Sequence, residues 1–521
     1  MRPSRPSSLP MRTARAMPRR PPPSPRPRGR SSRSPTCASS WRCCVERHPC
    51  KDASMTKSHS KKADPVQDAL TPMPALAAYL ARALKQPLPA EVADKAKAHM
   101  LDTIASMVSG ARMKAGSAAI AYIKALGETG TRSAVAGTRL YTSPVHAALA
   151  NGMFAHADET DDSHAASLTH PGCGIVPAVL AAAEFFGRSG QDMLRAMVLG
   201  YDVCARLTLS LHAYDFRVAG HSTHTFGPNF GAAAAAGALA GLDETQCRHV
   251  MSYAAQQASG VACWMRDKDH IEKSFDFGGM AARNGVSAAI MVASGCTGVD
   301  DVFSGERNFY HAFGDDPDRL ALGRELGVRY EILGTSIKRW TVGSPIQAPL
   351  DSTHTLVHRH QLKADAIKAV RVRIPHESLT IVNNREMPEI CLQHLVAMML
   401  IDGNIDFHTA HDRARMQDPR VLALRALITL EGDDELSRAM PSRQGIVEIT
   451  LDDGSTVVEH TKAVRGTPLN PMTREEVQAK AMGLLAPVLG EVRAAALCDA
   501  VWSLEKVHDA RAFTALMQPA E

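Results

Sequence analysis

Residues 151–171 read NGMFAHADETDDSHAASLTHP. Between His156 and His170 this stretch holds four acids and three histidines in fifteen residues, and an alanine-rich segment that resembles a buried helix lies on each side of it. Charged groups placed against a core are costly unless they are paired, hydrogen-bonded or used in chemistry. We therefore interpret the stretch as the lining of an active site rather than as a surface loop.

The flanking sequence determines the fold class that we expect. Apolar residues recur at three- and four-residue spacing, with Gly or Pro at most of the joints, and loops are expected at 110–143 and 157–172. Ala, which suits closely packed helices, is abundant, whereas aromatic residues are few. The pattern predicts helices over 74–85, 90–109, 144–156, 173–187, 190–210, 228–241, 243–259 and 278–294.

The pattern changes after about residue 325. Residues 366–374 alternate with period two, which predicts a strand, and 446–459 predict a hairpin with a Gly-containing turn, among helical patterns at 344–360, 389–402 and 408–415. The tail from Thr473 to Leu516 returns to helix. We expect a mainly α protein, with a large all-helical domain over 71–320 that is completed by 465–516, and a smaller α+β domain over 325–460.

The net charge of +5 over 521 residues hides two different regions. Residues 1–55 carry a net charge of +11, which leaves −6 for the rest of the chain, where no basic stripe or nucleic-acid motif is found. Because the first region is rich in Pro, Arg and Ser, we expect residues 1–70 to be a disordered tail or a mis-annotated extension that precedes a true start at Met55. A transit peptide is a third interpretation, which the three prolines at 21–23 disfavour.

Cysteine usage and hydropathy predict the compartment. Beyond residue 55 the chain has seven scattered cysteines and no CxxC pair, which favours reduced thiols over a disulfide framework or a metal ribbon. No window holds about 18 uninterrupted apolar residues, so no transmembrane helix is expected. We therefore predict a cytoplasmic protein with no nucleic-acid or membrane partner.

Four further stretches place polar groups beside predicted helices. Each also has a structural interpretation: a capping turn for the first, a surface lysine for the second, a linker rim for the third, and a tight turn with a capping box for the fourth, where the structural interpretation is favoured. The functional alternative for the first three is the binding of a carboxylate by helix N–H groups and by cations. These stretches are 220–227 (GHSTHTFG), 273–279 (KSFDFGG), 336–345 (SIKRWTVGSP) and 465–473 (RGTPLNPMT).

Taken in order, these motifs resemble those of the MmgE/PrpD family, which includes 2-methylcitrate dehydratase, cis-aconitate decarboxylase and iminodisuccinate epimerase. The resemblance covers about 71–516. It implies that the α+β domain is a lid, that the active site lies in the cleft below it, and that the protein is a homodimer. It also implies a lyase that acts on a small di- or tricarboxylate without cofactor or metal.

The resemblance carries the family's site residues onto this chain position by position. Several positions depart from the family pattern: Glu159, with Asp158 adjacent, stands where the family has Asp, Asp276 replaces a His, and one extra residue precedes Thr169. The implied catalytic residues are His170, His221, Asp158, Glu159 and Lys273. The implied substrate-binding residues are Ser163, Thr169, His224, Lys338, Arg339 and His394.

The chemistry of this substrate class explains these residue types. Removing water, CO₂ or a proton beside a carboxylate builds negative charge, so it needs cations and a positioned acid and base. A hydro-lyase similar to 2-methylcitrate dehydratase is our leading interpretation, with a decarboxylase, an epimerase or a silent carboxylate-binding protein as alternatives. The acidic run at 158–162 also resembles the Mg²⁺ motif of isoprenoid synthases, but no second acidic motif accompanies it.

Overall fold

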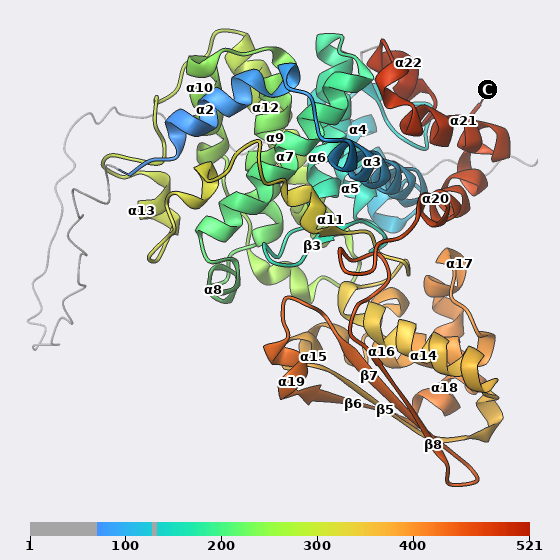
Figure 1. Cartoon of the computed structure of the whole chain (residues 1–521). Helices are drawn as coiled ribbons and strands as arrows, with labels where there is room; N and C mark the ends of the chain where they lie inside the picture. The colour runs from blue at the N-terminus through green and yellow to red at the C-terminus, as the bar shows by residue number, and fades with distance from the viewer. Residues whose placement is uncertain (1–69, 128–132, 521) are drawn as a thin grey trace, which may run out of the picture. The chain divides into compact units, whose positions relative to one another are not determined.

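The computed structural model describes residues 70–127 and 133–520. The segment 1–70, for which disorder or mis-annotation is predicted, lies outside the described residues except for Leu70. Residues 63–521 form one compact unit. The described part of this unit is mainly α, as the sequence predicts, with one small sheet (Figure 1).

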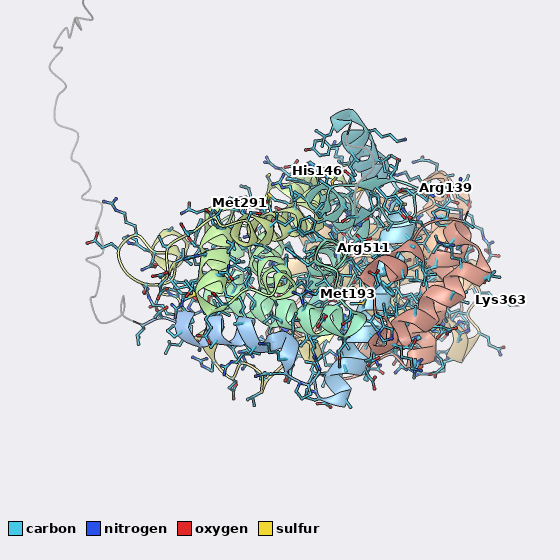
Figure 2. The ribbon with its side chains drawn as sticks, turned by 90° about the horizontal axis from the view of Figure 1, so that it is seen from above. Arg139, His146, Met193, Met291, Lys363 and Arg511 are labelled. Carbon is cyan, nitrogen blue, oxygen red and sulfur yellow. The ribbon has the colours of Figure 1, made fainter. Side chains whose placement is uncertain are left out.

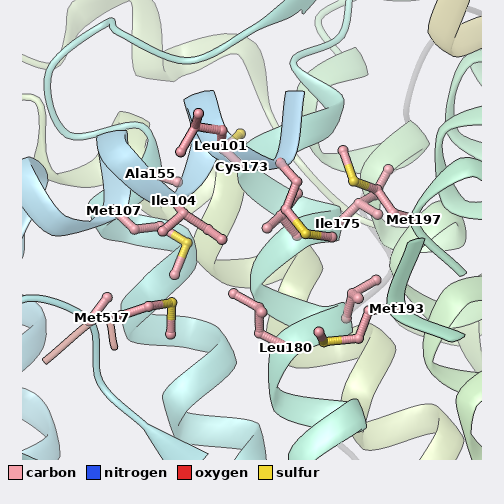
Figure 3. Close-up of a cluster of buried hydrophobic side chains, with 14 of the residues drawn as sticks. Leu101, Ile104, Met107, Ala155, Cys173, Ile175, Leu180, Met193, Met197 and Met517 are labelled. Atoms are coloured by element: carbon pink, nitrogen blue, oxygen red, sulfur yellow. The ribbon is translucent and has the colours of Figure 1, made fainter. Parts of the chain in front are cut away.

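The helical part of the unit surrounds helix α9, which packs against α6, α7, α10 and α12. Its apolar faces meet in a core of small and flexible side chains, and Figure 3 shows Leu101, Ile104, Cys173 and Met197 within it. The helices are α2 (Met73–Arg82), α3 (Ala90–Gly110), α4 (Lys114–Leu126), α5 (Pro144–Ala155), α6 (Pro171–Phe186), α7 (Gly190–Ser210), α8 (Ala213–Val218), α9 (Thr223–Ala240), α10 (Glu244–Gln256), α11 (Ile271–Ser274), the π-helix η3 (Phe275–Gly279), α12 (Met280–Ala293) and α13 (Phe309–Phe313).

The C-terminal helices pack on the N-terminal ones. Helix α20 (Arg474–Leu489) runs against α3, α21 (Glu491–Trp502) contacts both, and α22 (Ala510–Ala515) packs on α6. Seen from above, the red C-terminal helices lie beside the light-blue helix α3 and away from α2 (Figure 2). A capping box at Thr473 and Glu476 starts α20, as the sequence predicts.

The sheet has the strand order β6-β5-β7-β8. Strand β5 (Ile367–Pro375) pairs in parallel with β6 (Ile428–Asp433) and antiparallel with β7 (Gly445–Leu451), which forms the predicted hairpin with β8 (Thr456–Thr461). Val370, Val372 and Ile374 of β5 are buried, because alternate side chains face the helices. The helices of this part are α14 (Gln347–His360), α15 (His376–Val382), α16 (Leu392–Asp402), α17 (Phe407–Ala410), α18 (Pro419–Arg425) and α19 (Asp434–Arg438).

Three local expectations are wrong. The predicted loop over 110–143 contains helix α4 and two short paired strands, β1 (Ser133–Ala134) and β2 (Tyr141–Thr142). Helix α9 begins at Thr223 rather than at residue 228, and Pro228 lies inside it. Within the predicted loop over 157–172, β3 (Ser163–His164) pairs with β4 (Thr335–Ser336), which ties the acidic stretch to the segment that carries Lys338.

Two observations concern the expected absence of a transmembrane helix and the expected reduced thiols. Within the described ranges no helix is long and apolar enough to cross a membrane. The described cysteines are all free, and five of the seven are buried.

Candidate active site

The acidic stretch is buried, as its interpretation requires. Asp158, Glu159, Asp161 and Asp162 are each at most 4% exposed. Buried carboxylates must find partners, and these four find different ones. Asp162 accepts hydrogen bonds from the N–H of Gly172 and from the hydroxyl of Tyr201 and also lies 2.7 Å from the His99 ring, and so it holds the start of helix α6 in place.

Glu159 is the point at which two lysines converge. The ammonium group of Lys273, on helix α11, contacts its Oε1. Lys338 lies 3.4 Å from its Oε2 and donates a 2.7 Å hydrogen bond to its backbone carbonyl. Burial alone would raise the pKa of Glu159, but the two lysines hold it well below the usual range, so the carboxylate is ionised.

Asp161 positions two histidines. Its Oδ2 lies 2.9 Å from Nδ1 of His156 and 3.2 Å from Nδ1 of His170, while its Oδ1 lies 3.5 Å from the ammonium group of Lys338. Burial opposes the charge of Asp161, but the two histidines and the lysine keep its pKa well below normal. An Nδ1 proton held by Asp161 leaves Nε2 of His170 as the free lone pair, which is the arrangement of a general base.

His170 is neutral at physiological pH in the ligand-free protein. Burial lowers its pKa to about 4, Asp161 opposes this effect, and Lys338 adds to it. A negatively charged ligand beside the ring would oppose the effect of burial and raise the pKa of His170. His170 can therefore accept a proton when a polyanion binds.

The ring of Phe277 lies beside the charged groups and packs against several other rings. Its ring stacks on His224 with centroids 3.8 Å apart and on His156 with centroids 4.0 Å apart. The Lys273 ammonium lies 5.1 Å from the Phe277 centroid and 5.4 Å from that of Trp264, within the range of cation–π attraction. His224 is thereby brought within 5.3 Å of His170, ring to ring.

Two glycines allow this arrangement. Helix α5 and the π-helix η3 touch through Gly152 and Gly278: a Cβ on Gly278 would lie 2.2 Å from the carbonyl oxygen of Gly152. The close contact brings Lys273 and Phe277 over His156. The backbone is also strained nearby, because Glu159, Leu168 and His270 all adopt positive φ near 50–60°.

Four of the predicted site residues lie outside this cluster. His221 stacks on Phe216 with centroids 4.3 Å apart, because helix α9 begins after it and turns only His224 inward. Asp158 is buried against Ser109, which donates to its Oδ2. The other two lie elsewhere: Arg339 pairs with Asp351 of α14 at 3.4 Å, and His394 is buried in α16.

The remaining predicted residues lie at or beside the cluster. Ser163 sits in β3, and its side chain lines a cavity of about 270 Å³ together with Lys338. The hydroxyl of Thr169 lies 2.6 Å from that of Ser167 and closes the turn ahead of His170. A second cavity, of about 560 Å³, lies on the other side of Ala165 and Ala166 and is lined by Arg217 and Arg443.

The sequence interpretation assigned no role to two members of the cluster, His156 and His270. Both are buried, and each has a ring nitrogen with no hydrogen-bond partner among residues 70–127 and 133–520. Their Nε2 atoms lie 4.0 and 3.8 Å from Oε1 of Glu159. The three-residue spacing of His156 and Glu159 was the available signal, whereas nothing in the sequence singles out His270.

A family model of the MmgE/PrpD N-terminal domain matches residues 74–320, and one of the MmgE/PrpD C-terminal domain matches residues 340–506. The chain belongs to the MmgE/PrpD family. The relatives that it resembles are named for two different activities. Human cis-aconitate decarboxylase is 25% identical over 448 residues, which cover 82% of this chain and 90% of that protein.

Two further MmgE/PrpD relatives come from fungi. A cis-aconitate decarboxylase of Aspergillus terreus is 24% identical over 462 residues, 81% of this chain and 91% of that protein. The 2-methylcitrate dehydratase-like protein oryR of Aspergillus oryzae is 28% identical over 171 residues, 30% of this chain and 34% of its own. The full-length similarity is therefore to decarboxylases.

The site of this MmgE/PrpD protein also contains side chains of metal-ligand type. A lysine ammonium group already lies beside the carboxylate in each of two such groups, and this charge would repel a divalent cation. Each group therefore offers enough ligand atoms for a metal ion, but the charge of the neighbouring lysine makes the position unfavourable for a cation. The groups, whose ligand atoms lie within 4.8 Å of one another, are His156 with Asp161 and Cys173, and His156 with Glu159 and His270.

Proposed function

We propose that the protein is a lyase that removes CO₂ from a small tricarboxylate, as its cis-aconitate decarboxylase relatives do by name, without metal or cofactor. One observation carries the proposal: His170 is held through Nδ1 by Asp161 and lies beside the charge network of Lys273, Lys338 and Glu159. Full-length similarity to decarboxylases supports the reaction.

Decarboxylation requires one electron pair and one proton to be handled. When the bond between carbon and the departing carboxylate breaks, CO₂ leaves and its bonding electrons remain on the substrate, where a proton must quench them. Burial lowers the pKa of His170, and the negative charge of a bound polyanion would raise it again and favour the protonated ring. The protonated His170 can then deliver that proton from Nε2. In this proposal Lys338, which lies 3.5 Å from Oδ1 of Asp161, stabilises the negative charge that develops on the reacting group.

Dehydration, our leading interpretation from the sequence, is less well supported. It rests on the similarity to 2-methylcitrate dehydratase-like protein oryR, which spans 30% of the chain. The same histidine and lysines could serve dehydration or epimerisation, because each builds negative charge beside a carboxylate. We therefore prefer decarboxylation because of the similarity to decarboxylases. The residues of the site do not by themselves distinguish the three reactions.

Product analysis separates these reactions. Purified full-length protein is incubated with cis-aconitate, 2-methylcitrate, citrate and iminodisuccinate, and the products are followed by NMR. We expect cis-aconitate to be consumed with release of CO₂. Loss of water from 2-methylcitrate with inert cis-aconitate would contradict decarboxylation, and binding of these acids in thermal-shift assays without any turnover would identify a silent binding protein.

A variant assigns the reaction to His170. His170→Gln removes the acid/base group and should lower kcat by about 10²–10⁴, while His360→Gln, at the exposed end of helix α14, serves as the matched control. Both variants should fold, as judged by circular dichroism. Near-full turnover by His170→Gln would remove this residue from the mechanism.

We also propose that the protein acts as a cytoplasmic homodimer. The compartment is supported by the free cysteines among the described residues, and the dimer follows from the family resemblance. Light scattering coupled to size-exclusion chromatography tests the dimer, which a monomeric mass would contradict.

A further inference from the structure

The charged groups of the cluster neutralise one another. Lys273 pairs with Glu159, and Lys338 lies between Glu159 and Asp161. Both carboxylates are ionised, because their pKa values are held well below normal against the effect of burial. Two lysines facing two carboxylates leave no net positive charge for a substrate that carries two or three carboxylates of its own.

Two arginines beside the cluster carry charge that is not neutralised in this way. Arg217 lies on helix α8 and Arg443 precedes strand β7, and both are half-buried. Within the described residues neither guanidinium forms an ion pair, and the partner that Arg217 does have is the ring of Tyr214, 5.7 Å away. A guanidinium group keeps its charge in proteins, so both remain cations.

Both arginines line the same cavity of about 560 Å³. Its wall includes Ala165, Ala166 and Leu168, which belong to the turn between the acidic stretch and His170. Arg443 also lines the cavity of about 270 Å³ that contains Lys338. The arginines therefore lie beside the turn that leads to His170.

The electrostatics agree with this placement. The pKa of His224 is lowered mainly by burial, then by the nearby histidines, and also by the charge of Arg217. Glu159 acts on the guanidinium of Arg443, whose pKa is lowered by burial and by Arg217. The two arginines thus lie within electrostatic range of the cluster.

The one carboxylate in the cavity wall does not neutralise the pair. Glu377 lines the cavity and accepts a 3.2 Å hydrogen bond from the hydroxyl of Ser437. One acid beside two arginines leaves an excess of one positive charge. A pair of guanidinium groups in a cavity suits a carboxylate, whose two oxygens match the guanidinium donors.

We propose that Arg217 and Arg443 form a carboxylate-binding subsite that holds an arm of the substrate remote from the reacting bond and selects tricarboxylates over shorter dicarboxylates. This inference rests on the proposed function for its substrate class. In this proposal the arginines recognise the charge of the substrate arm. Lys273 and Lys338 stabilise the charge of the reacting group.

Binding of an unreactive tricarboxylate tests the subsite. Tricarballylate and succinate, which lacks one acetate arm, are titrated into the full-length protein by calorimetry. We expect Arg443→Gln and Arg217→Gln each to weaken tricarballylate binding roughly 10- to 100-fold, and succinate binding by less than about threefold. Arg443→Lys should recover part of the loss, because the charge remains and the paired donors do not.

Arg420→Gln, on the exposed start of helix α18, is the matched control and should bind both acids like the unmodified protein. Circular dichroism checks that each variant is folded. An equal loss for both acids, unchanged tricarballylate affinity, or no binding of tricarballylate to the unmodified protein would each overturn the subsite. If the protein shows arginine-dependent binding but no turnover of cis-aconitate, the proposed function fails and the subsite stands.

Discussion

The ion pairs of Glu159 allow a quantitative prediction. In Glu159→Gln, Lys273 loses its carboxylate, whereas Lys338 keeps Asp161 at 3.5 Å. Removing one partner of a buried pair costs about 3–5 kcal/mol, because the other charge stays buried without compensation. Since one of the two lysines keeps a partner, we expect the lower end of that range, about 3 kcal/mol of unfolding free energy.

Tryptophan fluorescence during chemical denaturation measures this loss, because Trp264 lies 5.4 Å from the ammonium of Lys273. Glu431→Gln is the matched control: it breaks an ion pair with Arg371 whose side chains are 43% and 48% exposed, and such exposed pairs contribute little to stability. Tricarballylate should stabilise Glu159→Gln more than the unmodified protein, because an anion can replace the lost carboxylate beside Lys273.

The pH dependence of the difference has a defined sign. The folded pKa of Glu159 lies well below its ordinary value of 4.5, so its stabilisation is present above about pH 4.5 and is lost as the pH falls through the folded pKa. The gap between the unmodified protein and Glu159→Gln should therefore be constant from pH 6 to 8 and shrink below pH 4.5. A gap under 0.5 kcal/mol at pH 7 would refute the reasoning, because Lys273 would then not depend on Glu159.

Three further predictions follow from neighbouring contacts. The pKa of buried Asp276 is raised to about 6, mainly by burial, so Asp276→Asn should stabilise the fold above pH 6 by up to about 3 kcal/mol, with a gain that fades toward pH 4 in thermal melts. Gly278→Ala forces a Cβ against the backbone of Gly152, and it should cost at least about 1–3 kcal/mol and most of the activity, whereas a variant with normal melting and turnover would contradict the contact. Turnover should survive prolonged dialysis against a chelator, since Lys273 already supplies the cation beside Glu159; loss that zinc restores would instead support a metal at His156.

Periodicity predicted the long elements of the fold well. The helix expected at 90–109 is Ala90–Gly110, and the strand expected at 366–374 is Ile367–Pro375. Helix α4 was missed although its buried residues Ala115, Ala119 and Ile123 recur at four-residue spacing on one face. Strand β6 was missed because Gly432 and charged residues interrupt its alternation, and because its partner β5 lies about 60 residues away in the sequence.

The site was predictable in composition and less so in geometry. Glu159, Lys273 and Lys338 meet in space although they come from three distant segments, and their order along the chain was the available clue. The choice between His221 and His224 depended on where helix α9 begins. Pro228 suggested a start at 228, but the helix opens at Thr223, and only the later histidine turns toward Phe277.

The segment between the acidic stretch and His170 bears on the proposed substrate selectivity. Oδ2 of Asp161 lies 2.9 Å from Nδ1 of His156 and 3.2 Å from Nδ1 of His170, so the acidic stretch is fixed on both histidines. Backbone hydrogen bonds between His164 and Thr169 close the segment into a turn, in which Leu168 takes a positive φ.

That turn lines both cavities, one of which also contains Lys338 of the charge network. Ala165 and Ala166 line both cavities, and their small side chains leave the space beside Arg443 open. A change of length in this turn alters the shape of the space in which a substrate arm would lie, while the contacts of Asp161 with His170 stay the same. If Arg217 and Arg443 bind a substrate arm as proposed, the groups that select the substrate lie apart from those that act on the reacting bond.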